Sequence, residues 1–161
     1  MGVGADFTIE WWGYSGYDWA GKTERGLVGN RARALVTDGG FLIIVMNAAG
    51  ATGDIIVKLC DGTSEYSGTW QDVLSINAWD HIVVTYTEAT DTLELFVNSV
   101  SQGTLTATNK ITTSARNLLI GEAYTNDRYY VGSIALLRAH NRLLSALEIQ
   151  NDYQQEKHLF H

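Results

Sequence analysis

Apolar side chains recur at every second position along much of this chain, and this spacing leaves few folds open to it. Phe7, Ile9 and Trp11 occupy alternate positions, and the same spacing recurs over residues 82–86 and 93–97. Successive side chains of a β-strand point to opposite faces, so this period buries one face of a strand and leaves the other less apolar. The chain is therefore predicted to be an all-β protein.

Glycine-containing turns separate the strand-like segments. The 161 residues include 16 glycines and no proline, as suits paired strands, because proline removes a donor from a sheet ladder whereas glycine supplies the positive φ of tight hairpins. We expect about ten to thirteen short strands with no repeat or linker between them, so that residues 1–161 form one β-sandwich domain. The clearest segments are residues 7–12, 27–28, 34–37, 41–48, 55–60, 81–87, 92–98, 118–121 and 129–139.

Helix is expected only at the C-terminal end. Ser145 and Glu148 have the spacing of a capping box, in which each side chain bonds the backbone of the other residue. Ala146, Ile149 and Tyr153 follow at i, i+3 and i+7, which places them on one stripe of a helix. We predict a short helix that packs this stripe against the sheets.

Net charge and cysteine content exclude several classes of partner and site. Eleven Lys and Arg against 18 Asp and Glu give a net charge of −7 at pH 7, and phosphate binding needs clustered positive charge. Nucleic acid and membranes are therefore not expected partners. The single Cys60 rules out an internal disulfide and a cysteine-rich metal site. No signal peptide is recognised at the N-terminus, and the longest strongly apolar run, residues 41–46, is too short to span a bilayer.

Four motifs, in order along the chain, resemble those of one known family. They are W-D-H-I-V-V-T-Y at 79–86, L-E-L-F-V-N-S at 93–99, L-I-G at 119–121, and Y-V-G-S-I at 130–134 followed by N-R-L-L-S-A-L-E-I at 141–149. Together they resemble the laminin-G-like domains of the concanavalin A-like lectin/glucanase superfamily, over residues 6 to 153. The resemblance implies a jelly-roll β-sandwich of two antiparallel sheets with a short C-terminal helix.

Departures from the family pattern bear on catalysis and on metal binding. Where relatives carry Asp-Glu after G-x-I, this chain has Ala135 and Leu136, so the calcium ligation known in some relatives is not carried over. The glucanases of the superfamily carry two catalytic glutamates in an E-x-D-x-x-E pattern, which suits a retaining mechanism. The chain has no such triplet, and Glu10 stands alone between Ile9 and Trp11. We predict that the protein is not an enzyme.

Aromatic and planar polar residues gather in three segments that read as loops, residues 13–22, 61–72 and 122–129. Sugars are bound by stacking on aromatic rings while Asp, Asn or Arg side chains hold the hydroxyls. The candidate ligand residues are Tyr14, Tyr17, Asp18 and Trp19 in the first segment, Tyr66 and Trp70 in the second, and Tyr124, Asn126, Asp127 and Arg128 in the third. The alternative for the first segment is that its aromatic rings fold back onto the core.

Other aromatic and titratable residues have structural explanations. We expect Trp12 and Trp79 to pack within the sandwich and His81 to be a structural histidine, hydrogen-bonded near the core. We expect no cofactor. Calcium is the alternative, because the second and third loop segments carry carboxylates, although neither has the spacing of a dedicated calcium loop.

Taken together, these features predict a non-catalytic recognition or adhesion module. Binding of one glycan unit would be weak, so the module would act by multivalent display on a cell surface or a phage particle, as a homo-oligomer or in several copies. Its expected partner is a glycan or a surface protein, and its expected location is an extracellular surface or a virion. Two alternatives stay open. One is a structural virion protein that docks onto capsid or tail proteins; the other is a degenerate glycoside hydrolase whose acid pair comes from separate strands.

Overall fold

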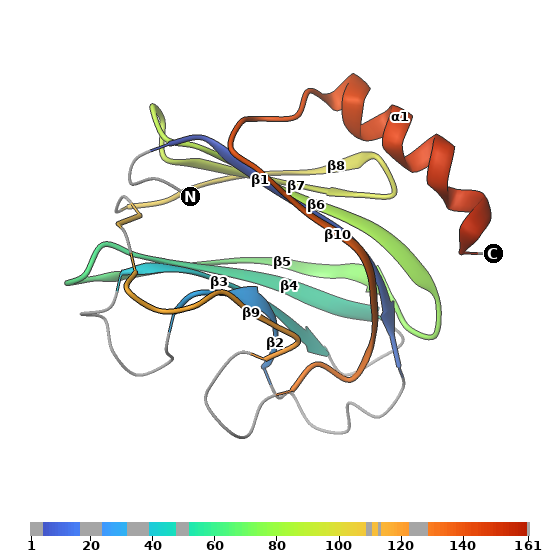
Figure 1. The fold of residues 1–161 in the computed structure, drawn as a ribbon, viewed down its shortest axis with the longest axis horizontal. Coiled ribbons are helices and arrows are strands. Elements are labelled where there is room, and N and C mark those ends of the chain that lie inside the picture. The colour runs from blue at the N-terminus through green and yellow to red at the C-terminus, as the bar shows by residue number, and fades with distance from the viewer. Residues whose placement is uncertain are drawn as a thin grey trace.

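Two antiparallel sheets of five strands each stack face to face in this protein (Figure 1). The computed structural model describes residues 5–16, 24–31, 39–47, 52–108, 111–112, 114–122 and 129–160. The first sheet contains, in spatial order, β10 (Gly132–His140), β1 (Phe7–Ser15), β6 (Trp79–Thr87), β7 (Thr92–Val97) and β8 (Val100–Thr106). The second contains β5 (Glu65–Ser75), β4 (Thr52–Cys60), β3 (Gly40–Asn47), β2 (Arg25–Gly29) and β9 (Leu119–Ile120). The all-β sandwich predicted from the sequence is confirmed.

Two strands differ from the expectation drawn from the sequence. Residues 61–72 were expected to form a loop, but β5 begins at Glu65 and pairs with β4 along most of its length. Its apolar residues are interrupted by Gly68, so the alternation is weak in the sequence. β8 is largely exposed and shows little apolar alternation. The predicted strand at residues 34–37 lies outside the described residues.

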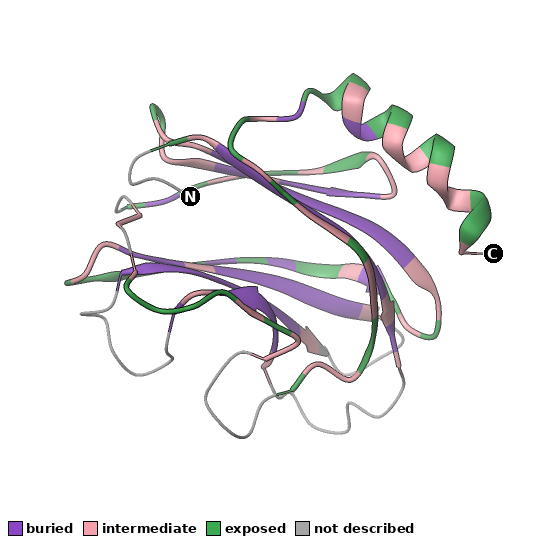
Figure 2. Ribbon diagram, in the orientation of Figure 1, coloured by how far each residue is buried: buried purple, intermediate pink, exposed green. Residues whose placement is uncertain are grey.

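The main core fills the space between the two sheets. Phe7, Ile9 and Trp11 of β1 point inward, and they belong to the same buried cluster as Ile43 and Val57 of the second sheet. Figure 2 shows that the central strands of both sheets are the most buried part of the chain. The residues between these inward positions therefore lie on the outer faces of the sheets.

A single α-helix of the described residues, α1 (Ala146–Glu156), lies across the outer face of the first sheet and is followed by the short 3₁₀ helix η2 (Lys157–Leu159) (Figure 1). The predicted capping box is confirmed: Ser145 Oγ accepts from the Glu148 backbone N–H, and Glu148 Oε2 accepts from the Ser145 backbone N–H. Among the described residues, no helix has the length and apolar character needed to cross a membrane.

The apolar contact of α1 differs in part from the predicted stripe. Ile149 is fully buried and forms a cluster with three residues, Val83, Phe96 and Leu144. Ala146 is exposed, so its assignment to the packing stripe is wrong. Leu144, in the turn before the helix, supplies that contact instead, because the chain reaches the sheet before the helix begins.

The hairpin between β7 and β8 offers a direct test of the local backbone. Asn98 and Ser99 have φ angles of 51° and 66°, the positive values that a type I′ turn requires at both central residues. A serine in this region carries a steric cost that glycine does not, so Ser99→Gly is expected to stabilise the protein by about 0.5–1 kcal/mol in urea unfolding. Asn98→Gly is the contrasting variant. Its side chain accepts from the His81 backbone N–H and donates to Asp80, so this change is expected to destabilise the protein. A loss of stability in Ser99→Gly would contradict the turn assignment.

Candidate functional site

The outer face of β1 carries a polar cluster beneath α1. Because Ile9 and Trp11 point into the core, the alternate residues Thr8, Glu10 and Trp12 point outward. All three are nevertheless buried, and Glu10 is 0% exposed. A buried carboxylate requires compensating charge or hydrogen bonds from the residues around it.

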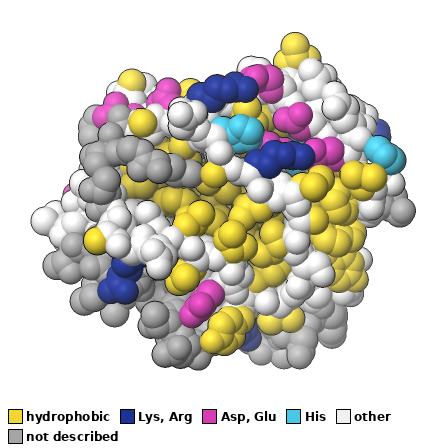
Figure 3. Space-filling model, in the orientation of Figure 1, with side chains coloured by type: hydrophobic (Ala, Val, Ile, Leu, Met, Phe, Trp, Pro, Cys, Tyr) yellow, Lys and Arg dark blue, Asp and Glu magenta, His cyan; other side chains and the backbone are white. Residues whose placement is uncertain are grey.

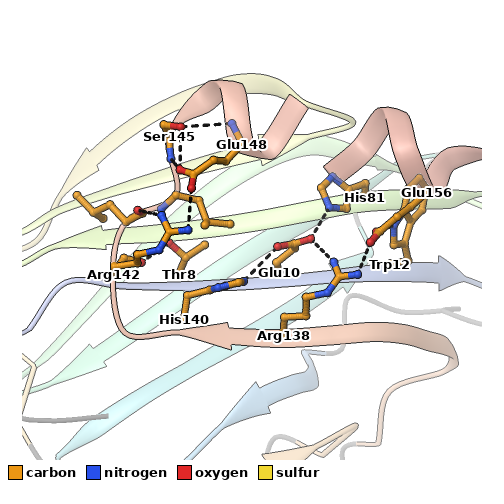
Figure 4. A network of polar contacts seen from close by, with 12 residues as sticks. Thr8, Glu10, Trp12, His81, Arg138, His140, Arg142, Ser145, Glu148 and Glu156 are labelled. Atoms are coloured by element: carbon orange, nitrogen blue, oxygen red, sulfur yellow. Dashed lines mark hydrogen bonds and ion pairs between the residues drawn. The ribbon is translucent and has the colours of Figure 1, made fainter. Parts of the chain in front are cut away.

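Three basic side chains surround Glu10 (Figure 4). Arg138 Nη1 donates to Glu10 Oε1 at 2.5 Å, and His81 Nε2 lies 3.3 Å from the same oxygen. His140 Nε2 lies 3.3 Å from the other oxygen, Oε2. Strand pairing therefore gives Glu10 partners from β6 and β10 that its own strand does not supply. The buried His81 fits the structural role predicted for it.

The charge state of Glu10 follows from two opposing effects. Burial alone would raise the pKa of this carboxyl, but the hydrogen bond with His81 and the positive charge of Arg138 outweigh burial and lower the pKa below its usual value. Glu10 is thus a carboxylate at neutral pH. The Arg138 pKa is raised in turn, chiefly by its hydrogen bond to Glu156 and despite partial burial.

A bulge in β10 places the basic residues on the outer face. Glu10 pairs with Arg138 and Trp12 pairs with Ala135, so two residues of β10 oppose one residue of β1. Leu136 lies in this bulge with a φ angle of 49°. Without the extra residue, regular alternation from the inward-facing Ile134 would turn Arg138 into the core. The bulge therefore directs Arg138 toward Glu10.

The C-terminal part of α1 is attached to the same cluster. Glu156 accepts hydrogen bonds from the Arg138 guanidinium and from Trp12 Nε1, the latter at 2.8 Å. The Trp12 ring also stacks on Tyr153, with centroids 5.8 Å apart, and on Phe160, with centroids 4.4 Å apart. Trp12 thus packs within the fold, as expected from the sequence, and it fixes the end of the helix.

The N-terminal part of α1 is attached separately. Thr8 Oγ1 donates to the Arg142 carbonyl at 2.9 Å and accepts from the Leu144 N–H at 3.0 Å. The Arg142 guanidinium donates to Glu148, and together with the hydrogen bonds from Ser145 this lowers the pKa of Glu148 to about 2. Two ion pairs, Arg142 with Glu148 and Arg138 with Glu156, therefore join β10 and the turn after it to α1.

A polar hollow of about 490 Å³ lies between these two ion pairs. Its volume falls within the range of about 300–1,000 Å³ typical of small-molecule sites. It is lined by Arg138, His140, Arg142, Leu144, Glu148, Asn151, Asp152 and Gln155. Figure 3 shows basic, histidine and acidic side chains gathered on this face of the molecule, next to a broader area of apolar side chains.

One set of side chains in the cluster has the composition of a metal site. Glu10, His81 and Glu156 each offer a ligand atom, and these atoms lie within 4.8 Å of one another. The Arg138 guanidinium, however, bonds both carboxylates and already supplies the positive charge that a metal ion would bring. In this arrangement Glu10 and Glu156 bind an arginine, and His81 contacts Glu10.

Of the sequence-predicted ligand residues, the structure describes Tyr14, Tyr66 and Trp70, and these three do not lie on one surface. Trp70 is only 6% exposed and belongs to the main core, where its indole N–H donates to the Gly103 carbonyl at 3.2 Å. It is therefore a packing residue, because β5 turns it toward the other sheet. Tyr66 faces the same core from β5 and is half-buried, and burial raises the pKa of its hydroxyl.

Tyr14 lies on the opposite side of the first sheet from Tyr66 and Trp70. It lies on the outer face of β1, where its ring contacts Trp79 at a centroid distance of 5.7 Å. The other candidates lie outside the described residues and stay predictions: Tyr17, Asp18, Trp19, Tyr124, Asn126, Asp127 and Arg128. In the second loop segment, residues 61–72, which was one of the two considered for calcium, the Asp61 carboxylate accepts hydrogen bonds from the backbone N–H groups of Thr63 and Ser64.

The sequence did contain a signal for the hollow. Arg138, His140 and Arg142 recur at every second position, and Glu148, Asp152 and Glu156 recur at every fourth position. The first spacing places basic groups on one face of a strand, and the second places acidic groups on one face of a helix. Complementary stripes of this kind predict a strand and a helix that face each other.

Known proteins resemble this chain in sequence pattern and in fold. The family model described as the concanavalin A-like lectin/glucanases superfamily matches residues 2–150. No curated protein matches the sequence. The CBM40 of the Ruminococcus gnavus IT-sialidase, solved bound to α2,3-sialyllactose, has a TM-score of 0.71 at 16% identity, covering 94% of this chain and 84% of that one.

Two further structures share the fold. The binding domain of botulinum neurotoxin serotype D has a TM-score of 0.72 at 13% identity and covers 94% of this chain, which spans only 36% of that chain. The heptameric SAP-like pentraxin of Limulus polyphemus has a TM-score of 0.66 at 10% identity, covering 93% of this chain and 71% of that one. The family match extends over nearly the whole sequence, and the chain belongs to the concanavalin A-like lectin/glucanases superfamily.

Proposed function

We propose that this protein is a non-catalytic module that binds glycans, weakly at a single site and more strongly when several copies are displayed together. The observation that carries the proposal is the likeness to the Ruminococcus gnavus CBM40, because it extends over 94% of this chain and 84% of a domain solved with sialyllactose. The likeness therefore involves the whole sandwich of both proteins and not one motif.

The arrangement of carboxylates supports binding without hydrolysis. Glu10 and Glu156 are acids from separate elements that come close together, as a glycosidase pair would. Arg138 bonds both of them, and Glu10 is fully buried beneath α1. Neither a free general acid nor an accessible nucleophile results from this geometry, so the degenerate glycosidase is the weaker reading.

A comparison of glycan binding by the monomer and by a multivalent form tests the proposal. The protein is biotinylated at one end, and binding to an array of neutral and sialylated glycans is compared for the monomer and for a streptavidin tetramer. We expect the tetramer to bind at least one glycan class, with an apparent affinity about 10²–10⁴ times that of the monomer. A folded tetramer that binds no glycan would remove the proposal and favour a structural role on a particle.

A further inference from the structure

The hollow between β10 and α1 has walls of opposite charge. Arg138 and Arg142 lie on the strand side, and Glu148 and Asp152 lie on the helix side. Both arginines are already paired with carboxylates, Arg138 with Glu10 and Glu156 and Arg142 with Glu148. Two arginines therefore face four carboxylates, those of Glu10, Glu156, Glu148 and Asp152, so negative charge is in excess around the hollow. An anion entering the hollow would meet this excess of carboxylates and would have to displace one of them from an arginine, so the site disfavours acidic ligands.

Hydrogen-bonding capacity remains in the middle of the hollow. Among the residues that the structure describes, the Asp152 carboxylate has no hydrogen-bond or ion-pair partner, and partial burial raises its pKa. Asn151 and Gln155 on the same helix offer amide donors and acceptors, and His140 on the opposite wall is 26% exposed. A ligand that both donates and accepts hydrogen bonds at closely spaced atoms would satisfy these groups, as sugar hydroxyls do.

A second hollow lies beside the end of β10 and the turn after it. It has a volume of about 360 Å³ and shares His140 and Arg142 with the larger one. Leu144 gives the larger hollow an apolar surface on which the C–H face of a sugar ring could rest. Two adjoining spaces of this size suit an oligosaccharide of more than one unit.

From these observations we infer that the groove between β10 and α1 is a binding site for a neutral oligosaccharide, with Asp152, Asn151 and Gln155 holding its hydroxyls. The inference rests on the proposed glycan-binding function and names the ligand class for one site. This site shares no residue with the ligand candidates that were predicted from the sequence. The excess of carboxylates over arginines distinguishes it from a site for acidic sugars.

Calorimetric titration with a matched set of sugars tests the inference. Cellobiose, maltose and lactose serve as neutral probes, and 3′-sialyllactose serves as the acidic counterpart of lactose. We expect the wild-type protein to bind at least one neutral disaccharide and to bind sialyllactose no more tightly than lactose. Asp152→Asn, which keeps the shape of the side chain but removes its charge, is expected to weaken neutral-sugar binding about tenfold. Gln155→Ala, at an exposed position, is expected to weaken it without a change in thermal midpoint.

Two further variants serve as controls. Asp72→Asn makes the same chemical change on β5 of the other sheet and is expected to leave sugar affinity unchanged. Trp19→Ala removes the indole of a ligand candidate in the first predicted loop segment, residues 13–22. This change is expected to leave the affinity of the groove for neutral sugars unchanged. Unchanged binding in both Asp152→Asn and Gln155→Ala, or much tighter binding of sialyllactose than of lactose, would overturn the inference while the proposed function stands. A wild-type protein that binds no glycan in any format would overturn both.

Discussion

Glu10→Ala is expected to destabilise the protein by about 3–5 kcal/mol in urea unfolding, the usual cost of removing one partner from a buried ion pair. The carboxylate is 0% exposed and contacts Arg138, His81 and His140. Its removal leaves the Arg138 guanidinium without one of its two carboxylate partners and opens a cavity beneath α1. A loss below about 1 kcal/mol, the level of an exposed ion pair, would contradict the account of this cluster.

The pH dependence of Glu10→Gln separates the charge from the shape of the side chain. The pKa of Glu10 is lower in the folded protein than its usual value of 4.5, so its contribution to stability is present above about pH 4.5 and is lost as pH falls through the folded value. The stability difference between wild type and Glu10→Gln is therefore expected to shrink on acidification below about pH 4.5. A difference that stays constant from pH 7 to pH 3 would contradict a charged Glu10.

Gly132→Ala is expected to prevent folding or to destabilise the protein by more than about 4 kcal/mol. Gly132 has a φ angle of 153°, and a Cβ atom at this position would lie 1.9 Å from the Tyr14 carbonyl oxygen. That oxygen belongs to the paired backbone of β1, opposite the start of β10, so it cannot move aside without breaking the ladder. The measurement is the yield of folded protein and the midpoint of urea unfolding.

Gly103→Ala is the matched control for this clash. Gly103 also has a positive φ angle, 93°, but a Cβ atom there would meet nothing within 4 Å. An alanine at this position would therefore add only the strain of a left-handed backbone conformation, and the expected loss of stability is about 1–2 kcal/mol. Equal effects of the two substitutions would contradict the close approach of β10 to β1.

Most of the fold could be predicted because its strands carry their own signal. The apolar alternation in β1, β6 and β7 is local, and so is the capping box at Ser145 and Glu148. β5 and β8 gave no such signal. Glycine and polar residues interrupt the apolar alternation of β5, and β8 is largely exposed, so its sequence does not need to alternate. Local patterns predict strands whose burial is complete on one face, and they missed β5 and β8, each of which lies at one edge of its sheet.

The candidate site could not be predicted in the same way, because its contacts are distant in sequence. Glu10 is 71 residues from His81 and 128 residues from Arg138, so only the strand order brings them together. The bulge at Leu136 adds a second difficulty. It shifts the alternation of β10 by one residue at Leu136, and leucine does not predict a positive φ. The shared face of Arg138 and His140 is visible in their spacing, but counting from the apolar residue Ile134 would have placed that face in the core.

The central claim is that this sandwich binds glycans and does not cleave them, and an NMR titration of the labelled protein tests both parts in one tube. Backbone amide shifts are followed as a neutral disaccharide is added, and the sugar is examined again after prolonged incubation. We predict saturable shifts at His140, Arg142, Asn151 and Asp152, with the disaccharide intact at the end. The absence of shifts with every glycan tried at millimolar concentration, or the release of monosaccharides, would contradict the account.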